Sequence, residues 1–202
     1  MSNILITGGT GFIGSHTCLL LLNEGHTIYV VDNLSNSSEK VIDRIKSLTA
    51  EEDYKKNLHF FIGDIRDNKF LSAVFDKARQ ENSGIDSVVH FAGLKSVAES
   101  ISRPIDYWDT NVNGTIVLLE TMKLNNCKTI VFSSSATVYG YPISTPINES
   151  DAVQPINPYG QTKAAVERLL NDVSKSEPDE WRIACLRYFN PVGAHPSGLM
   201  GE

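Results

Sequence analysis

The chain has 202 residues, with 18 lysines and arginines against 24 aspartates and glutamates, so its formal net charge is −6. Its hydrophobic content of 41% is enough for a sizeable core, but its acidity disfavours nucleic acid as a partner, because phosphate would repel the chain. The longest uninterrupted aliphatic run, Leu19–Leu22, is far shorter than the roughly 20 residues that span a bilayer, so we expect no membrane partner.

The start of the chain and its cysteines indicate the compartment. The N-terminus enters an apolar strand pattern without a basic leader, which predicts no signal peptide. Cys18, Cys127 and Cys185 are odd in number, widely spaced and set in apolar segments. They predict buried free thiols of a reducing, cytoplasmic protein, and neither a disulfide framework nor a metal site.

Short apolar runs alternate along the chain with segments of helical period. The predicted strands are Ile4–Thr7, Thr27–Val31, Leu58–Ile62, Ser87–Phe91, Thr129–Ser133 and Ile183–Tyr188. The predicted helices are Phe12–Asn23, Glu39–Leu48, Asn68–Gln80 (capped by Asp67), Ile105–Leu124 and Tyr159–Val173. This alternation predicts an α/β fold, a doubly wound parallel sheet of the Rossmann type with helices on both faces.

Two segments interrupt the alternation. The charged run Thr49–Asn57 is typical of a solvated surface extension. The long connection Tyr139–Asn157 is rich in Pro, Ser and Asn, and we expect it to line a site because long ordered loops are commonly functional.

Glycines at positions 8, 11 and 14 separate the first strand from the first helix. This spacing is typical of a phosphate cradle, in which Gly8 permits the tight turn, Gly11 admits a pyrophosphate and Gly14 allows close packing of helix and sheet. The alternative is an ordinary glycine turn. Asp32 ends the second strand, where a carboxylate accepts hydrogen bonds from a ribose diol. No Arg or Lys occupies residues 33–39, which favours NAD over NADP.

Tyr159 and Lys163 lie four residues apart at the start of a predicted helix, and this spacing puts both on one face. Asn157 is the expected cap and Pro158 suits the first helical position. A lysine ammonium nearby is expected to lower the phenol pKa by about two units, which would make Tyr159 a base near neutral pH. The hydroxyls of Ser133–Ser135 end the fifth strand, at the sheet edge where such folds bind ligands.

These residues, taken together, resemble the extended short-chain dehydrogenase/reductase superfamily and, within it, most closely the UDP-glucose (UDP-galactose) 4-epimerase family. The motifs that carry the resemblance are TGGTGFIGSHT (7–17), VDNLSNS (31–37), GDIRD (63–67), HFAGLKSVAES (90–100), NVNGT (111–115), SSSATVYG (133–140), PYGQTK (158–163) and LRYFNPVGAH (186–195).

The resemblance implies roles for individual residues. Tyr159 would be the general base and acid, Lys163 would lower its pKa and bind the nicotinamide ribose, and Ser135 would bind the sugar 4-hydroxyl. Lys95 and Asn190 would join Ser135 and Tyr159 in binding the UDP-sugar. The residues expected along NAD are Gly8, Gly11, Phe12, Ile13, Gly14, Asp32, Asn33, Leu34, Ser35, Asn36, Ser37, Asp64, Ile65, Phe91, Ala92, Gly93, Lys95, Asn111, Ser133, Tyr159, Lys163, Tyr188 and Phe189. For Asp64 and Ile65 an Asx turn is the alternative.

The implied reaction inverts the C4 hydroxyl of UDP-glucose or UDP-galactose through a transient 4-keto sugar, in galactose metabolism. One alternative is a nucleotide-sugar 4,6-dehydratase, which would need carboxylates just after Ser135, where Ala136–Val138 supply none. The other is an NAD-binding domain without turnover.

The resemblance also implies a division of the chain. Residues 1–189 would be the NAD-binding domain, and residues 190–202 would begin a substrate-binding lobe that is largely missing here. We therefore expect this chain to bind NAD with little turnover, and the full-length protein to form a homodimer through the helices around 105–124 and 159–173.

Overall fold

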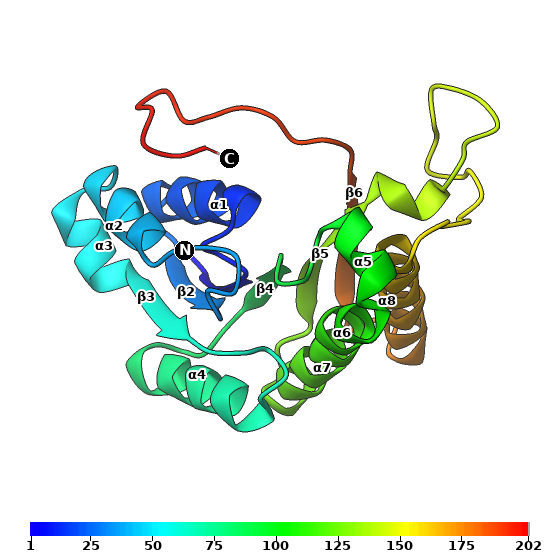
Figure 1. The fold of residues 1–202 in the computed structure, drawn as a ribbon. Coiled ribbons are helices and arrows are strands. Elements are labelled where there is room, and N and C mark those ends of the chain that lie inside the picture. The colour runs from blue at the N-terminus through cyan, green and yellow to red at the C-terminus, as the bar shows by residue number, and fades with distance from the viewer. Residues whose placement is uncertain (202) are drawn as a thin grey trace.

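In the computed structural model, which describes residues 1–201, six parallel strands form one sheet in the order β3-β2-β1-β4-β5-β6 (Figure 1). The strands are β1 (Asn3–Thr7), β2 (Thr27–Asp32), β3 (Leu58–Ile62), β4 (Ser87–His90), β5 (Thr129–Ser135) and β6 (Arg182–Tyr188). Strand order reverses between β1 and β4, where Ile6 pairs with Val30 on one side and Val89 on the other. The predicted doubly wound sheet is confirmed, and the reversal marks the point where such sheets bind ligands.

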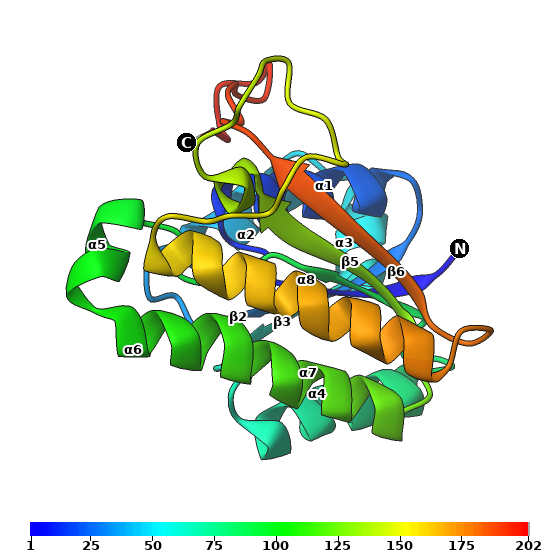
Figure 2. The same ribbon diagram turned by 90° about the vertical axis from the view of Figure 1, so that its right-hand side faces the viewer.

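Helices cover the sheet in two layers. The helical elements are α1 (Phe12–Asn23), α2 (Lys40–Ser47), α3 (Glu51–Asn57), α4 (Asn68–Glu81), α5 (Val97–Ser102), α6 (Pro104–Tyr107), the π-helix η1 (Trp108–Asn113), α7 (Gly114–Leu124), the 3-10 helix η2 (Ala136–Tyr139) and α8 (Pro158–Ser176). One core joins α1 and α2 to the face of β1 and β2 that carries Ile6 and Val30. The opposite core joins α4, α7 and α8 to the face that carries Leu5 and Val31. Figure 2 shows α8 running alongside α7 across β5 and β6.

Three helical segments differ from the predictions. Residues 51–57 form α3, where a surface extension was expected, because acids fill its first turn, bases fill its last, and Tyr54 packs on the core beside α1. The single helix predicted over 105–124 is divided into α6, η1 and α7. The short helix α5, begun by the Ser96 cap on the Glu99 amide, was not predicted.

The cysteine prediction holds for two positions of three. All three thiols are free, and Cys18 and Cys127 are buried, but Cys185 is exposed because β6 is an edge strand paired only with β5. Within residues 1–201 no helix is both long enough and apolar enough to cross a bilayer.

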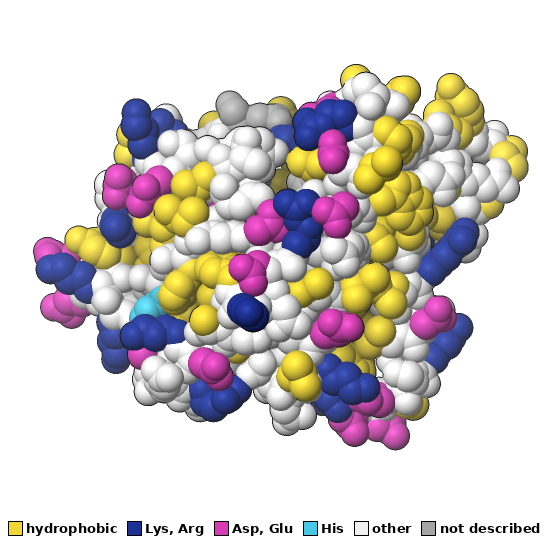
Figure 3. Space-filling view, turned by 60° about the horizontal axis from the view of Figure 1, so that its bottom comes forward, with side chains coloured by type: hydrophobic (Ala, Val, Ile, Leu, Met, Phe, Trp, Pro, Cys, Tyr) yellow, Lys and Arg dark blue, Asp and Glu magenta, His cyan; other side chains and the backbone are white. Residues whose placement is uncertain are grey.

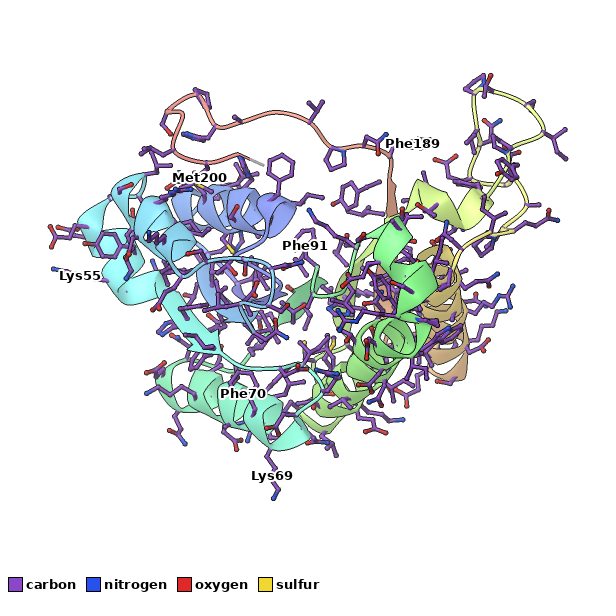
Figure 4. The ribbon with its side chains drawn as sticks, in the orientation of Figure 1. Lys55, Lys69, Phe70, Phe91, Phe189 and Met200 are labelled. Carbon is purple, nitrogen blue, oxygen red and sulfur yellow. The ribbon has the colours of Figure 1, made fainter. Side chains whose placement is uncertain are left out.

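The chain beyond β6 returns across the molecule. Figure 4 shows Phe189 just past the end of β6 and Met200 beside α1. Met200 is buried in the core that contains Ile6 and Cys18, and its carbonyl accepts a hydrogen bond from the His195 amide at 2.8 Å.

Candidate active site

The carboxyl ends of the parallel strands bring most of the predicted site residues to one edge of the sheet. Gly8 follows β1, Asp32 ends β2, Phe91 follows β4, Ser135 ends β5 and Tyr188 ends β6. These positions are far apart in sequence, and the sheet order alone gathers them around the switch point between β1 and β4.

In the turn between β1 and α1, a side chain at Gly8 or Gly14 would collide with backbone atoms. Gly8 has a φ of +70°, and a Cβ there would lie 2.6 Å from the Ala92 nitrogen. At Gly14 a Cβ would lie 2.3 Å from the Gly8 oxygen. Gly11 is the N-cap of α1 and offers no side-chain cap. Amide groups at the start of α1 are therefore left without a capping side chain, the arrangement that binds phosphate oxygens.

Asp32 is buried and braces this turn. One carboxylate oxygen accepts from the Thr10 amide at 3.1 Å, and the other accepts from the Leu34 amide at 2.9 Å and the Ser37 hydroxyl at 3.1 Å. Leu34 adopts the left-handed region with a φ of 58°, which is strained for a branched side chain. The carboxylate thus has a fixed position before any ligand arrives.

The turn after β3 adopts the Asx geometry that was the alternative for Asp64. The Asp64 carboxylate accepts from the Arg66 amide at 2.9 Å and from the Arg66 guanidinium, and these bonds lower its pKa to about 2. Asn33 also donates to Asp64, at 3.2 Å. The Ile65 side chain is buried in the core against Gly114. The cofactor contact predicted for Ile65 would therefore have to be made by its main chain.

Ser135, Tyr159 and Lys163 meet at the end of β5. Asn157 caps α8 by accepting from the Gly160 amide at 2.8 Å, which places Tyr159 in the first turn as predicted. The Ser135 side chain lies beside the Tyr159 phenol, where hydrogen bonding lowers the phenol pKa, and the Ser135 oxygen lies 2.8 Å from that of Thr137.

The Lys163 ammonium is turned towards the sheet. It donates to the Ser133 carbonyl at 2.7 Å and lies 5.9 Å from the centre of the Tyr159 ring. Burial lowers the pKa of Lys163 to about 8. Burial also raises the pKa of Tyr159, with the Ser135 bond opposing it, so the lowering expected from Lys163 is not present in this state.

Asn111, a predicted cofactor contact, is buried on η1 with its amide engaged by the protein. Its oxygen accepts from the Leu94 amide at 2.8 Å, and its nitrogen donates to the Leu94 carbonyl and the Thr162 hydroxyl, both at 3.1 Å. In this structure Asn111 therefore holds the loop after β4 against α8.

A network beside the site was not predicted from the sequence. Glu167 on α8 accepts two bonds from Arg187 at 2.7 and 3.0 Å and another from Ser134. Arg187 also donates to the Tyr139 hydroxyl at 2.8 Å and to the Glu149 carbonyl at 3.2 Å. This network ties β5, β6, α8 and the long loop together. Its residues come from separate segments, so no sequence motif predicts it.

Other predicted residues lie at the margins. Phe189 and Asn190 are exposed just beyond β6, and Lys95 is exposed in the loop after β4. The long loop after η2 contributes Pro155 and Ile156 to a shallow cavity of about 290 Å³, which Pro104 and Trp108 line from the other side. Asn157, Pro158 and Gln161 complete the lining of that cavity, and Tyr159 is not part of it.

A Rossmann-type sheet, with Ser135 at the end of β5 and with Tyr159 and Lys163 beside it on α8, is typical of the short-chain dehydrogenase/reductase class. A family model described as GDP-mannose 4,6 dehydratase matches residues 5–202, and the chain belongs to this family. Its relatives include UDP-glucose 4-epimerase 2 of Oryza sativa subsp. japonica (51% identity over 98% of this chain and 47% of the relative) and the UDP-glucose 4-epimerase of Bacillus subtilis (50% identity over 98% and 56%). The resemblance predicted from the sequence is confirmed.

Solved structures agree with these relatives. The chain is similar to the UDP-glucose 4-epimerase of Bifidobacterium longum in complex with NAD+ and UDP, with a TM-score of 0.91 and 46% identity over 100% of this chain and 57% of that one. A Stenotrophomonas maltophila UDP-glucose-4-epimerase with bound NAD and formylated UDP-arabinopyranose matches at a TM-score of 0.91 and 44% identity, over 100% and 57%. The chain spans about half the length of the curated relatives it matches.

Proposed function

We propose that this chain provides the NAD site and the proton carrier of a UDP-glucose 4-epimerase. The proposal rests on one observation: Ser135, Tyr159 and Lys163 lie together at the end of β5. The glycine turn lies at the same edge of the sheet, on the other side of the switch point between β1 and β4. The names of the relatives, at 48–51% identity, support this substrate class.

The residues present fit NAD as the cofactor. A Cβ at Gly8 or Gly14 would fill the cradle, and Asp32 is held where it can accept from a ribose diol. A 2′-phosphate would meet this carboxylate with no Lys or Arg among residues 33–39 to offset it. When bound, NAD supplies chemistry by accepting a hydride from the sugar C4 and returning it.

Tyr159 would move the proton that accompanies each hydride transfer. Its phenol oxygen would take the proton of the sugar 4-hydroxyl. It would return the proton after the 4-keto sugar has rotated in the site to present its other face. Ser135 would orient the 4-hydroxyl beside the phenol. In the present structure the Lys163 ammonium donates to the Ser133 carbonyl, 5.9 Å from the Tyr159 ring centre. It would favour the phenolate by Coulomb attraction once it turned from that carbonyl towards the phenol oxygen.

The 4,6-dehydratase alternative is weaker, although the family description names that activity. Such a reaction eliminates water and needs an acid and a base beside the hydroxyl residue. Thr137 occupies that place, 2.8 Å from Ser135. The carboxylate that contacts Ser134, Glu167, is bound in two places by Arg187.

Product analysis tests the proposal. The chain is titrated with NAD and NADP, then incubated at high concentration with NAD and either UDP-galactose or GDP-mannose. We expect tighter binding of NAD and formation of UDP-glucose, read by NMR of the sugar protons. A 4-keto-6-deoxy product from GDP-mannose would support the dehydratase, and failure to bind either dinucleotide would support neither enzyme.

We propose further that residues 1–189 form the NAD-binding unit and that residues 190–202 begin the part that binds the nucleotide sugar. Asn190, just beyond β6, is exposed and could reach a sugar nucleotide there, with Lys95 in the loop after β4. The relatives extend well beyond the matched region, which supports a second wall of the site in a longer protein. Alone, this chain should turn over slowly, because one wall positions the sugar poorly.

A homodimer and a cytoplasmic location complete the proposal. Ile101, Ile105 and Trp108 are exposed on α5, α6 and η1, and in Figure 3 hydrophobic side chains gather on the side of the molecule where these elements lie. An exposed apolar patch of this kind favours association. The three free thiols support a reducing compartment.

A further inference from the structure

His90, the last residue of β4, is buried and satisfied at both ring nitrogens. Its Nδ1 lies 2.6 Å from the Thr7 hydroxyl at the end of β1, and its Nε2 lies 3.0 Å from the Thr115 hydroxyl on α7. Both threonines are fully buried, and the Phe132 ring lies 5.8 Å away. His90 thus joins the strand that leads into the glycine turn to α7.

The proton positions in this arrangement follow from the donors available. The Thr115 hydroxyl has one proton, which it donates to the Asn111 carbonyl at 2.6 Å, so it must accept from His90 Nε2–H. Nδ1 of the neutral ring then accepts from the Thr7 hydroxyl. Burial and the Lys163 charge both lower the pKa of His90, to about 3, so the ring is neutral at neutral pH.

The hydrogen bonds continue from Asn111 to the catalytic helix. The Asn111 amide donates to the Thr162 hydroxyl at 3.1 Å, and that hydroxyl donates to the Tyr159 carbonyl at 2.7 Å. Asn111 and Thr162 are both buried, so the path is shielded from water. Two sets of hydrogen bonds therefore meet at Asn111, one at its main-chain carbonyl and one at its side-chain amide, and Asn111 links the strand that precedes the glycine turn to the first turn of α8.

We propose that His90 is a positioning residue of the candidate site, and that its Nε2–H tautomer holds η1 where Asn111 and Thr162 set the place of Tyr159 relative to the glycine turn. A histidine ring suits this role because it presents an acceptor and a donor on opposite sides of a rigid frame. The inference deepens the proposed function and rests on it for its catalytic meaning, but its geometry can be tested without turnover.

The tautomer is tested by NMR of the 202-residue chain labelled with 15N in histidine, with the His90→Asn spectrum identifying the resonance. We expect a neutral ring with the proton on Nε2 that does not titrate between pH 7 and 5. A proton on Nδ1, or a charged ring at pH 7, overturns the inference.

Matched variants test the positioning. His90→Gln keeps a donor near the Nε2 position, whereas His90→Asn keeps only an acceptor near Nδ1, and Thr115→Val removes the next hydroxyl without changing its shape. The control is Thr121→Val, because Thr121 is an equally buried α7 threonine that donates to the Val117 carbonyl at 2.9 Å, whereas the His90 ring bonds to Thr7 and Thr115.

The readout is the phenol pKa of Tyr159, followed by 13C NMR of tyrosine-labelled protein and assigned with Tyr159→Phe. We expect His90→Asn and Thr115→Val to shift this pKa in the same direction, and His90→Gln and Thr121→Val to leave it near the wild-type value. Equal shifts in all four variants, no shift in any, or unfolding of both His90→Asn and Thr115→Val would show that His90 only supports the fold. These readouts need neither NAD nor sugar, so a failure of the proposed function would appear separately, as absent NAD binding.

Discussion

Tyr159 is the residue on which the proposed chemistry depends most, because it is the group placed to carry the proton. Tyr159→Phe keeps the ring and removes only the hydroxyl that lies beside Ser135. We expect turnover in a protein that contains this chain to fall by roughly 10²–10⁴-fold, with NAD affinity unchanged. Initial rates and NAD titrations measure the two effects, and Thr137→Val, which removes a neighbouring hydroxyl, is the control.

Asp32 has two tasks that substitutions can separate. Asp32→Ala removes the carboxylate proposed to bind ribose and also frees the Thr10 and Leu34 amides, whereas Ser37→Ala keeps the carboxylate and removes one bond to it and one to the Thr10 hydroxyl. We expect Asp32→Ala to weaken NAD more than NADP and Ser37→Ala to alter both slightly. Dinucleotide titrations of the two variants check this, and a wild-type chain that binds NADP more tightly than NAD would contradict it.

His90 also predicts how stability depends on pH. Its pKa is lowered to about 3 in the fold, so below its ordinary value of 6.5 the unfolded chain binds a proton that the folded chain does not. The free energy of unfolding should therefore fall as pH drops from about 6.5 to 5, by at most about 1.4 kcal/mol per pH unit for this group. The pKa of His59 is also lowered by burial and adds to the fall. Urea unfolding between pH 7 and 5 measures it, and His90→Gln should flatten the slope.

Among the elements, α8 depends on a cap next to the site. Asn157→Ala removes the acceptor of the Gly160 amide and should cost about 1 kcal/mol, which Asn157→Ser should largely restore. The matched control is Asp67→Ala, which removes the α4 cap on the Phe70 amide. Both should lower the unfolding midpoint, but only Asn157→Ala should also change the phenol pKa of Tyr159. Equal effects on Tyr159 would contradict a link between this cap and the site.

Strands and capped helices could be predicted because their signals are local. Asp67 and Asn157 cap helices as expected, and the strand ends differ from the predictions by one or two residues. The division at η1 could not be predicted, because it depends on the Asn111 bonds to Leu94 and Thr162, which lie far away in sequence.

The same distinction applies to the site. The glycine turn and the Tyr159–Lys163 spacing are visible in the sequence, but the direction of the Tyr159 pKa is not. That direction depends on burial of the phenol, which arises only when α8 packs on β5. Asn111 was predicted to contact the cofactor, but its amide is bonded to Leu94 and Thr162, again because of packing between distant segments.

At the scale of the whole molecule, the exposed apolar patch of Ile101, Ile105 and Trp108 predicts self-association. Ile105 is 81% exposed there, whereas Leu20 is 60% exposed on α1, on the other layer. If the apolar patch forms the dimer contact, Ile105→Glu should weaken the dimer and Leu20→Glu should not. Sedimentation equilibrium measures the dimer dissociation constant of both variants. If only Leu20→Glu weakened the dimer, the interface would lie on α1 and not on this patch.

In the proposed reaction this chain binds NAD, and Tyr159 takes the proton as hydride leaves the sugar. The most direct measurement mixes the NAD-loaded chain with excess UDP-galactose and follows the fluorescence of reduced nicotinamide, in wild type and in Tyr159→Phe. Even slow turnover should give a detectable signal in the wild type, while Tyr159→Phe binds NAD equally well and stays dark. If Tyr159→Phe reduced the nicotinamide as fast as the wild type, Tyr159 would not be the base.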